Sequence, residues 1–324
     1  MRIEKDALGE MPLPDGAYYG IQAFRSLSNF DVTDKTFNDY PAVVRALAEI
    51  KKACALANRD IGALGADKAG AIARACDDIL EGRMEGQFPV NIWRGGGTSI
   101  NMNLNEVIAN RANELLTGHK GYEQVHPNTH VNMCQSSNDV YPTAENIVLY
   151  RETGRALEGV AALENSFARK SKEFGGVVRL GRTCLQDGVP MTLGQVFAGF
   201  HGVIRRSRER LEALREGFRV GVLGGTVIGT GLGVLPGYVE AVYPHLSAIV
   251  GFEMRLPDTP EGSPVSDAGL FDAMQNADGL LTLSGALKVL ACSTGKIAND
   301  FRLLSSGPRS GFGEIRLPAV APPN

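Results

Sequence analysis

Residues 280–304, "LLTLSGALKVLACSTGKIANDFRLL", carry the clearest helical signal in the sequence. Their apolar stripe recurs at intervals of 3-4-3-4-3-4-3, through Leu280, Leu283, Leu287, Leu290, Thr294, Ile297, Phe301 and Leu304. Steps of three and four residues place these side chains along one face of an α-helix. A helix of this length is stable only when other helices cover that face. The stretch therefore predicts a bundle of long helices.

Two further stretches fit the same bundle. Residues 193–214 repeat the spacing as 4-3-4-3-4-3, through Leu193, Phe197, Phe200, Ile204, Ser207, Leu211 and Leu214. A third long helix is predicted to start near Pro142, because proline is favoured in a first helical turn. It would carry Leu157, Val160, Ala161 and Phe167. The sequence thus predicts a mainly α protein, possessing three long helices and no strand-rich core.

The remaining segments are less regular. The first 40 residues are rich in loop signals, including Asp15-Gly16, and residues 41–81 predict two alanine-rich helices. A glycine turn precedes a helical pattern over residues 100–115. Residues 220–237 are glycine-dense, and residues 256–267 form a polar loop. We predict an N-terminal helical domain over residues 1–139 and a central helical bundle over residues 140–324.

Bulk composition excludes several classes of function. The 324 residues carry 33 basic and 36 acidic side chains, a net charge of -3, which argues against a nucleic-acid surface. The five cysteines show no CxxC spacing, so neither a disulfide framework nor a metal site is expected. We find no apolar signal core and no uninterrupted apolar run of about 18 residues. We therefore expect a cytoplasmic protein that does not bind membranes.

Three polar clusters lie beside the predicted long helices. They cover residues 97–103, residues 135–139 and residues 181–187. Helix capping explains each cluster taken singly, and Ser136-x-x-Asp139 matches a capping motif. Taken together, they offer hydroxyls, amides and free backbone N–H groups, which are suited to binding carboxylates. Since no Ser-His-Asp triad or carboxylate pair stands out, we favour a donor-lined site for a small dicarboxylate.

These clusters belong to longer stretches that resemble the aspartase/fumarase superfamily. The similar stretches occur in the family's order across nearly the whole chain, and they read "RIEKDALGEMPLPDGAYYGIQAFRSLSNF", "GGGTSINMNLNEVIANRANELL", "HPNTHVNMCQSSNDVYPTAENI", "GRTCLQDGVPMTLGQ", "GGTVIGTGLG" and "ANDFRLLSSGPRSGFGEIRLPAV". The sequence most resembles aspartate ammonia-lyases. Tyr19-Gly20 replaces the Trp-Gly of fumarases, Met133 replaces their usual lysine, and "VPMTLGQ" agrees, whereas His126 fits both branches.

The resemblance implies a fold, a reaction and a set of site residues. The expected reaction is reversible anti-elimination of ammonia from L-aspartate, giving fumarate, in a homotetramer and without an organic cofactor. The resemblance implies that Thr98, Ser136 and Ser137 hold the carboxylate that takes the aci form. Asn138 would contact the leaving amine, and Thr183 the other carboxylate. The remaining substrate-binding candidates are Ser99, Asn101 and Cys184, the last standing where relatives often carry histidine.

The family's proton-abstracting base is expected beyond the final residues. In the family, the sequence after "LPAV" continues into a loop of pattern Gly-Ser-Ser-x-x-Met-Pro-x-Lys-x-Asn, whose second serine is the base. This sequence ends instead with "APPN" at residues 321–324. We therefore expect a C-terminally truncated chain without a catalytic base, with an incomplete bundle and no C-terminal domain. The alternatives are a fumarate hydratase, or an inactive remnant that only oligomerises.

Overall fold

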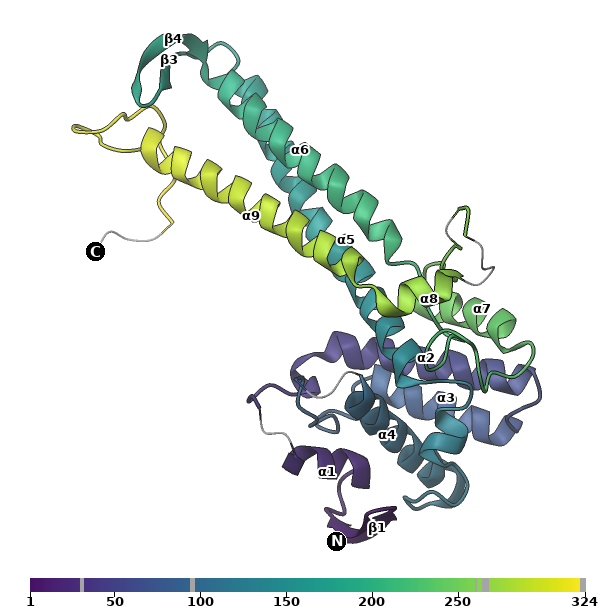
Figure 1. Cartoon of the computed structure of the whole chain (residues 1–324). Helices are drawn as coiled ribbons and strands as arrows, with labels where there is room; N and C mark the ends of the chain where they lie inside the picture. Colours follow the sequence, from purple (N-terminus) through teal and green to yellow (C-terminus); the bar gives the residue numbers. More distant parts are fainter. Residues whose placement is uncertain (30–31, 94–96, 260, 264–267, 321–324) are drawn as a thin grey trace. The chain divides into compact units, whose positions relative to one another are not determined.

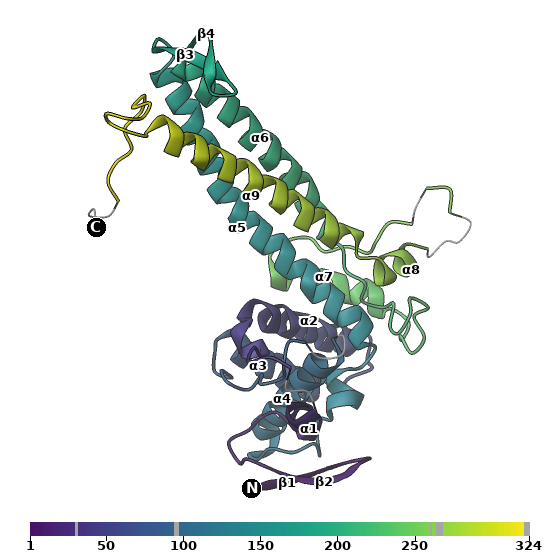
Figure 2. The same ribbon diagram turned by 60° about the vertical axis from the view of Figure 1, so that its left-hand side comes forward.

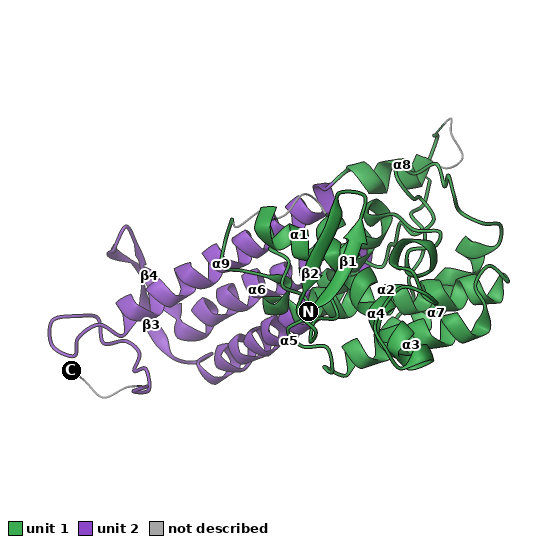
Figure 3. Ribbon diagram, turned by 90° about the horizontal axis from the view of Figure 1, so that it is seen from below, with its two compact units in different colours: residues 1–151, 218–276 green, residues 152–217, 277–324 purple. Residues whose placement is uncertain are grey.

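The structure is a computed structural model that describes residues 1–29, 32–93, 97–259, 261–263 and 268–320. Its contacts divide the chain into two units, coloured separately in Figure 3. Unit 1 comprises Met1–Arg151 and Phe218–Asn276, and unit 2 comprises Glu152–Gly217 and Ala277–Asn324. These units differ from the domains predicted on either side of the boundary between residues 139 and 140, because residues 218–276 pack with the N-terminal helices and belong to unit 1. That boundary therefore stays a prediction.

Unit 1 is built around helices that follow a short N-terminal hairpin (Figure 1). Its elements are β1 (Arg2–Asp6), β2 (Gly9–Leu13), α1 (Ile21–Asn29), the 3₁₀ turn η1 (Phe37–Asp39), α2 (Pro41–Asp60), α3 (Ala66–Leu80), α4 (Thr98–Thr117), the π-helical turn η2 (Pro127–Val131), the start of α5 (Ser137–Glu173), α7 (Tyr238–Val250) and α8 (Ala268–Gln275). The helices α2 and α3 confirm the two predicted over residues 41–81.

The core of unit 1 surrounds α2. This helix packs against α3, α4 and α7, and its buried face is largely alanine, which lets neighbouring helices approach closely. Leu47 and Ile50 are fully buried among them. The helix α7, which lies between Gly237 and Gly251, was not predicted from the sequence. It lies between the glycine-dense stretch and the polar loop. Both of those segments were recognised from the sequence, but no helix was predicted between them.

The N-terminal residues are more ordered than their loop signals indicated. Strands β1 and β2 pair antiparallel, with Arg2 opposite Leu13 and Asp6 opposite Gly9. The Asp6 side chain accepts a hydrogen bond from the Leu8 N–H at 2.9 Å, and Gly9 has a φ of +120°, so the turn is locally specified. Figure 2 shows this hairpin beside α1. The expectation of a loop-rich segment was therefore wrong here, although Asp15-Gly16 does form a turn.

The residue before α4, Gly97, lies against Tyr141 in the second turn of α5. A Cβ atom built on Gly97 would lie 2.3 Å from the Cβ of Tyr141, which is far too close. Only glycine therefore permits this approach of the two helices. The contact brings the first polar cluster, at the start of α4, next to the second cluster, at the start of α5. Residues 94–96 of the glycine turn lie outside the described residues.

The helix α5 begins at Ser137, so the predicted start near Pro142 was wrong. The capping motif explains the earlier start. The Oγ of Ser136 accepts from the Asn138 N–H at 3.2 Å, and the Asp139 carboxylate accepts from the Ser136 N–H at 2.9 Å. These two reciprocal bonds satisfy backbone groups that a helix end leaves open, and Pro142 follows inside the helix.

Unit 2 contains the long helices predicted from their apolar stripes. Its elements are the remainder of α5, a hairpin of β3 (Val178–Thr183) and β4 (Gln186–Thr192), α6 (Leu193–Gly217) and α9 (Asp278–Leu304). Figures 1 and 2 show α6 and α9 side by side. The stripe of α6 is buried at Leu193, Phe197, Phe200, Ile204, Ser207 and Leu211. The mainly α bundle is thereby confirmed.

An aromatic cluster joins the three long helices of unit 2. The Phe167 ring of α5 lies 5.7 Å from that of Phe200 on α6 and 6.3 Å from that of Phe301 on α9. The Phe200 and Phe301 rings meet edge to face at 5.5 Å. Such pairs add to the free energy of apolar burial. The stripe of α9 is only partly covered, because Leu283 and Ile297 are buried while Leu287 is 42% exposed.

The length and composition of α9 also match those of a membrane-spanning helix. The search for uninterrupted apolar runs missed it, because Lys288 and Lys296 interrupt the run. One such helix is weak evidence for a membrane protein, and the packing of α9 against α6 is what a helical bundle requires.

The third polar cluster lies on a hairpin, which the sequence did not predict. Strands β3 and β4 pair antiparallel, with Thr183 opposite Gln186. Cys184 and Leu185 form the turn between them, with φ angles of +51° and +62°. Two successive positive φ angles define a type I′ turn, whose twist matches that of the strands. The cluster therefore lies in a turn between strands, and the polar loop residues 260 and 264–267 lie outside the described residues.

Candidate functional site

Asn101 and Ser137 join the first two clusters. The Asn101 side chain, on α4, donates from Nδ2 to the Oγ of Ser137, on α5, at 3.0 Å. It also donates to the Oδ1 of Asn132 at 3.1 Å. Because the Ser137 hydroxyl accepts this bond, its own hydrogen stays available for an acceptor, and it has none in the described part of the chain. Ser137 is thus held as a donor.

Thr98 and Ser99 occupy the first turn of α4. Thr98 is exposed, and no partner for its hydroxyl occurs among the described residues, while the Ser99 hydroxyl lies 3.5 Å from that of Ser26. The residue before the helix is Gly97, which provides no capping side chain. The first N–H groups of α4 therefore lack a side-chain cap, and this end of the helix favours negative charge.

Asn138 faces the glycine-dense stretch. Its Nδ2 donates to the carbonyl oxygen of Val227 at 2.9 Å, which fixes the orientation of the amide. Its Oδ1 is then free to accept a hydrogen bond, as a leaving amine would require. The adjacent Thr226 N–H donates to the Asp139 carboxylate at 3.0 Å, so the stretch is anchored to the start of α5 by two consecutive residues.

A buried lysine is connected to these residues by hydrogen bonds, and it was not predicted from the sequence. The Lys51 side chain, on α2, is 0% exposed. Its Nζ donates to Asn132 Oδ1 at 2.9 Å and to Gln135 Oε1 at 2.8 Å. Lys51 follows Leu47 by four residues and precedes Cys54 by three, so it lies on the buried face of α2. A charged residue on an apolar helical face was the signal that could have identified it.

Burial dominates the electrostatics of this region. It lowers the pKa of Lys51 to about 8, partly offset by the nearby Asp139. This lowering means that the folded protein disfavours the charged ammonium by about 3 kcal/mol. Burial also raises the pKa of Asp139 to about 7, although the backbone N–H groups of Ser136 and Thr226 oppose that rise. Shifted ionisable groups of this kind gather at functional sites.

The last two candidates belong to unit 2. Thr183 and Cys184 are both exposed at the hairpin turn. The neighbouring Arg182 forms an ion pair with Glu314, and its guanidinium lies 4.2 Å from the centre of the Phe312 ring. The structure thus brings together the candidates on α4 and α5 within unit 1, while Thr183 and Cys184 remain candidates by resemblance.

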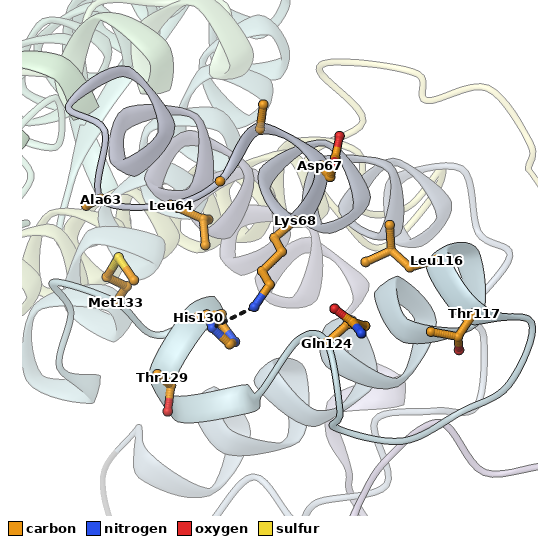
Figure 4. Close-up of a pocket in the computed structure, with 12 residues that line it drawn as sticks. Ala63, Leu64, Asp67, Lys68, Leu116, Thr117, Gln124, Thr129, His130 and Met133 are labelled. Atoms are coloured by element: carbon orange, nitrogen blue, oxygen red, sulfur yellow. Dashed lines mark hydrogen bonds between the residues drawn. The ribbon is translucent and has the colours of Figure 1, made fainter.

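A separate cavity of about 560 Å³ lies in unit 1 between the start of α3 and η2 (Figure 4). Lys68 Nζ lies 3.3 Å from His130 Nε2, and His130 Nδ1 accepts from the His126 N–H at 2.8 Å. That bond assigns the hydrogen of a neutral ring to Nε2, so both groups are donors. Since none of the predicted site residues lines this cavity, we do not assign the dicarboxylate to it.

No cluster of three or more metal-ligating side chains occurs among the described residues. The chemistry of the donors on α4 and α5 also differs from that of a metal centre. They are hydroxyl and amide groups, whereas histidine, thiolate and carboxylate are the usual ligands of transition metals. The arrangement is instead suited to hydrogen bonding with an anion.

The comparisons with known proteins agree with this description. The sequence profile of a family described as lyase matches residues 9–322. An aspartate ammonia-lyase of a Bacillus species is 43% identical over 324 residues, which are 99% of this chain and 67% of that protein. A fumarate hydratase class II of Ralstonia nicotianae is 43% identical over 325 residues, which are 99% of this chain and 68% of that protein.

Solved structures show the same fold. A fumarate lyase:delta crystallin from Brucella melitensis bound to cobalt superposes with a TM-score of 0.93 at 46% identity, covering 100% of this chain and 68% of that one. A recombinant class II fumarase from Schistosoma mansoni superposes with a TM-score of 0.88 at 35% identity, covering 100% of this chain and 69% of that one. The chain spans about two thirds of the length of these relatives.

Fold and sequence together define a lyase. The chain belongs to the aspartase/fumarase superfamily, as the resemblance implied. The aspartate ammonia-lyases among its relatives support its assignment as a carbon–nitrogen lyase.

Proposed function

We propose that this protein binds L-aspartate and catalyses its reversible conversion to fumarate and ammonia. The observation that carries the proposal is the pair of adjoining first turns of α4 and α5. The hydroxyl groups of Thr98, Ser136 and Ser137 donate to no acceptor in the described residues. Three unused donors beside two helix starts suit a carboxylate whose negative charge grows during proton removal.

The proposed roles combine the hydrogen bonds on α4 and α5 with what the family resemblance implies. Thr98, Ser136 and Ser137 stabilise the carboxylate that becomes the aci form. Asn138 accepts from the leaving amine through Oδ1, since its Nδ2 is held by the Val227 carbonyl. For Thr183 the resemblance alone supports a role, that of binding the second carboxylate, and Cys184 could offer only a weak thiol donor. Ser99 supports the first turn of α4.

Proton abstraction needs a further group. Hydroxyls and amides are poor bases at neutral pH, so the residues on α4 and α5 bind and polarise the substrate while another residue supplies the base. A missing base lowers a rate by about 10² to 10⁴. Binding is consequently the property that depends most directly on the residues of α4 and α5.

Hydration of fumarate is the second candidate reaction, because fumarate hydratases are as similar to this chain as aspartate ammonia-lyases. Met133 favours the amine reaction by resemblance. The test follows the ultraviolet absorbance of fumarate with L-aspartate and, in parallel, with L-malate. We expect aspartate to be preferred. Faster conversion of malate would select the hydratase, and conversion of neither substrate would contradict both reactions.

We also propose a cytoplasmic homotetramer. The support for assembly is the partly uncovered apolar stripe of α9, where Leu280 is 37% exposed and Leu287 42%. Exposed apolar stripes of this kind commonly mark contacts between subunits. Light scattering on the purified chain should give four times the mass of 34.6 kDa, and a monomer at micromolar concentration would contradict the proposal.

A further inference from the structure

Among the described residues, the buried cation Lys51 forms hydrogen bonds only with neutral groups. Its two acceptors are the amide oxygens of Asn132 and Gln135. Both amides are fixed in that orientation by their own donors. The Asn132 Nδ2 donates to the Gln135 carbonyl at 3.2 Å, and the Gln135 Nε2 donates to the carbonyls of Val131 and Met133 at 3.0 Å. A buried charge without a directly opposed carboxylate is costly, so its retention needs a reason.

A short path of hydrogen bonds connects this charge to the candidate site. Asn132 Oδ1, which accepts from Lys51, also accepts from the Nδ2 of Asn101 at 3.1 Å. The same Nδ2 donates to the Oγ of Ser137 at 3.0 Å. Asn105 donates to the same Asn132 oxygen at 3.2 Å. Three hydrogen bonds therefore separate the ammonium from the hydroxyl that faces the proposed carboxylate.

We propose that Lys51 is a positioning residue whose buried positive charge favours a dianionic ligand at the first turn of α5, acting through Asn132 and Asn101 without touching the ligand. The inference rests on the proposed function, since it assumes that a dicarboxylate binds beside Ser137. It extends that function, because it makes the net charge of the ligand, as well as its hydrogen-bonding groups, a determinant of affinity.

The size of the effect follows from Coulomb's law. At a separation of roughly 8 Å and an effective dielectric constant of about 20, two opposite unit charges change an affinity about 30-fold. The charged or titratable groups near Lys51 are Asp139 on α5, Cys54 on α2 and Cys76 on α3. Asp139 opposes the ligand, although its carboxylate is occupied by the N–H groups of Ser136 and Thr226. We therefore expect an effect of about tenfold or more.

The next residue provides a matched control. Lys52 has the same side chain on the same helix, but it is partly exposed and its Nζ pairs with Asp77 at 2.6 Å. Lys51→Met and Lys52→Met each remove one positive charge and keep an unbranched side chain. We expect Lys51→Met to weaken succinate binding, measured by titration calorimetry, about tenfold or more. Lys52→Met should bind within twofold of the wild type.

A neutral ligand distinguishes the effect of ligand charge on affinity from the effect of ligand shape. The diamide of succinate has nearly the same shape as succinate but no charge, so the effect of Lys51→Met on its affinity should be much smaller. Circular dichroism and thermal unfolding establish that both variants are folded. If Lys51→Met binds succinate within twofold of the wild type, the inference is wrong while the proposed function stands. If the wild type does not bind succinate, both fail.

The inference can also be tested on the wild type alone, without relying on a variant that must fold. Nuclear magnetic resonance of ¹⁵N-labelled lysine follows the protonation of the Lys51 amine with pH. Since a dianion stabilises the ammonium, saturating succinate should raise the pKa of Lys51 above its free value of about 8. Succinate affinity of the wild type should correspondingly fall as pH rises above 8. An unchanged Lys51 titration in saturating succinate would overturn the inference.

Discussion

Asn101 Nδ2 lies 3.0 Å from Ser137 Oγ, so a buried amide on α4 fixes the hydroxyl group of the first residue of α5. The amide is 1% exposed and uses both of its hydrogens, one on Ser137 and one on Asn132. Its Oδ1 is buried without a partner among the described residues, which costs stability. We infer that this amide is retained because it turns the Ser137 hydroxyl hydrogen towards the ligand.

This relationship predicts a specific loss in Asn101→Leu. Leucine has the same number and branching of side-chain heavy atoms as asparagine but donates nothing, so the Ser137 hydroxyl loses its fixed orientation. We expect affinity for fumarate to fall about tenfold, the value of one ordinary hydrogen bond. Fluorescence or calorimetric titration measures it.

The matched control for that variant is Asn103→Leu. Asn103 is also fully buried on α4, but its amide donates to the Gln87 carbonyl at 2.9 Å. Both variants should lose a comparable amount of stability, while Asn103→Leu should keep wild-type affinity. Equal losses of affinity in the two variants would indicate a general effect of helix α4 instead of an oriented hydroxyl.

Glu106 predicts a pH dependence of stability. Its carboxylate accepts backbone N–H groups at the start of α1, from Gly20 and Ala23 at 3.0 Å and from Gln22 at 2.8 Å. Burial raises the pKa of Glu106 to about 7 despite these bonds. The folded protein therefore binds more protons than the unfolded chain between about pH 4.5 and pH 7. The stability that this carboxyl contributes is lost as pH rises through that window.

Urea unfolding of the wild type and Glu106→Gln measures this contribution. The advantage of the wild type in unfolding free energy should fall by about 2.5 kcal/mol between pH 5 and pH 8, because the variant has no proton to release there. Glu85→Gln, at an exposed carboxyl of the same unit, is the control and should show a constant difference. A constant difference for Glu106→Gln as well would contradict the assigned pKa.

The β3–β4 turn predicts a stabilising substitution. Leu185 has a φ of +62° and is 62% exposed, so its side chain adds strain with little burial. Leu185→Gly should raise the free energy of unfolding by about 0.5–1 kcal/mol, since glycine adopts this φ without steric cost. Leu185→Ala keeps the Cβ atom and should not share the gain. If thermal unfolding shows that Leu185→Ala is as stable as Leu185→Gly, the backbone at this position is not strained.

The sequence predicted the parts of the fold that depend on periodicity. The alternating three- and four-residue spacing from Leu193 to Leu211 correctly predicted a buried helical face, and Ser136-x-x-Asp139 correctly predicted a cap. The start of α5 was misplaced because Pro142 was treated as a first-turn residue, whereas the cap fixes the helix start. The hairpin β3–β4 was missed because its turn uses Cys184 and Leu185 instead of the usual asparagine and glycine.

The site was predictable from resemblance and only partly from pattern. Hydroxyls and amides near helix starts indicated a carboxylate site, but their pairing across α4 and α5 depends on the close approach at Gly97, which no local pattern encodes. Lys51 was missed because a lysine within "EIKKACA" resembles a surface residue. Its burial depends on Asn132 and Gln135, which are about 80 residues away in sequence and meet it only in the folded chain.

Donors at the first turns of α4 and α5 are predicted to bind a small dicarboxylate. Equilibrium dialysis of labelled fumarate against the wild type, Ser137→Ala and Ser166→Ala tests this prediction most directly. Ser166 is the control, because it is a partly exposed serine on the same helix whose hydroxyl donates to the Ala162 carbonyl. We predict saturable binding by the wild type and Ser166→Ala, and affinity at least tenfold weaker for Ser137→Ala. Equal binding by all three proteins, or none by the wild type, would contradict the account.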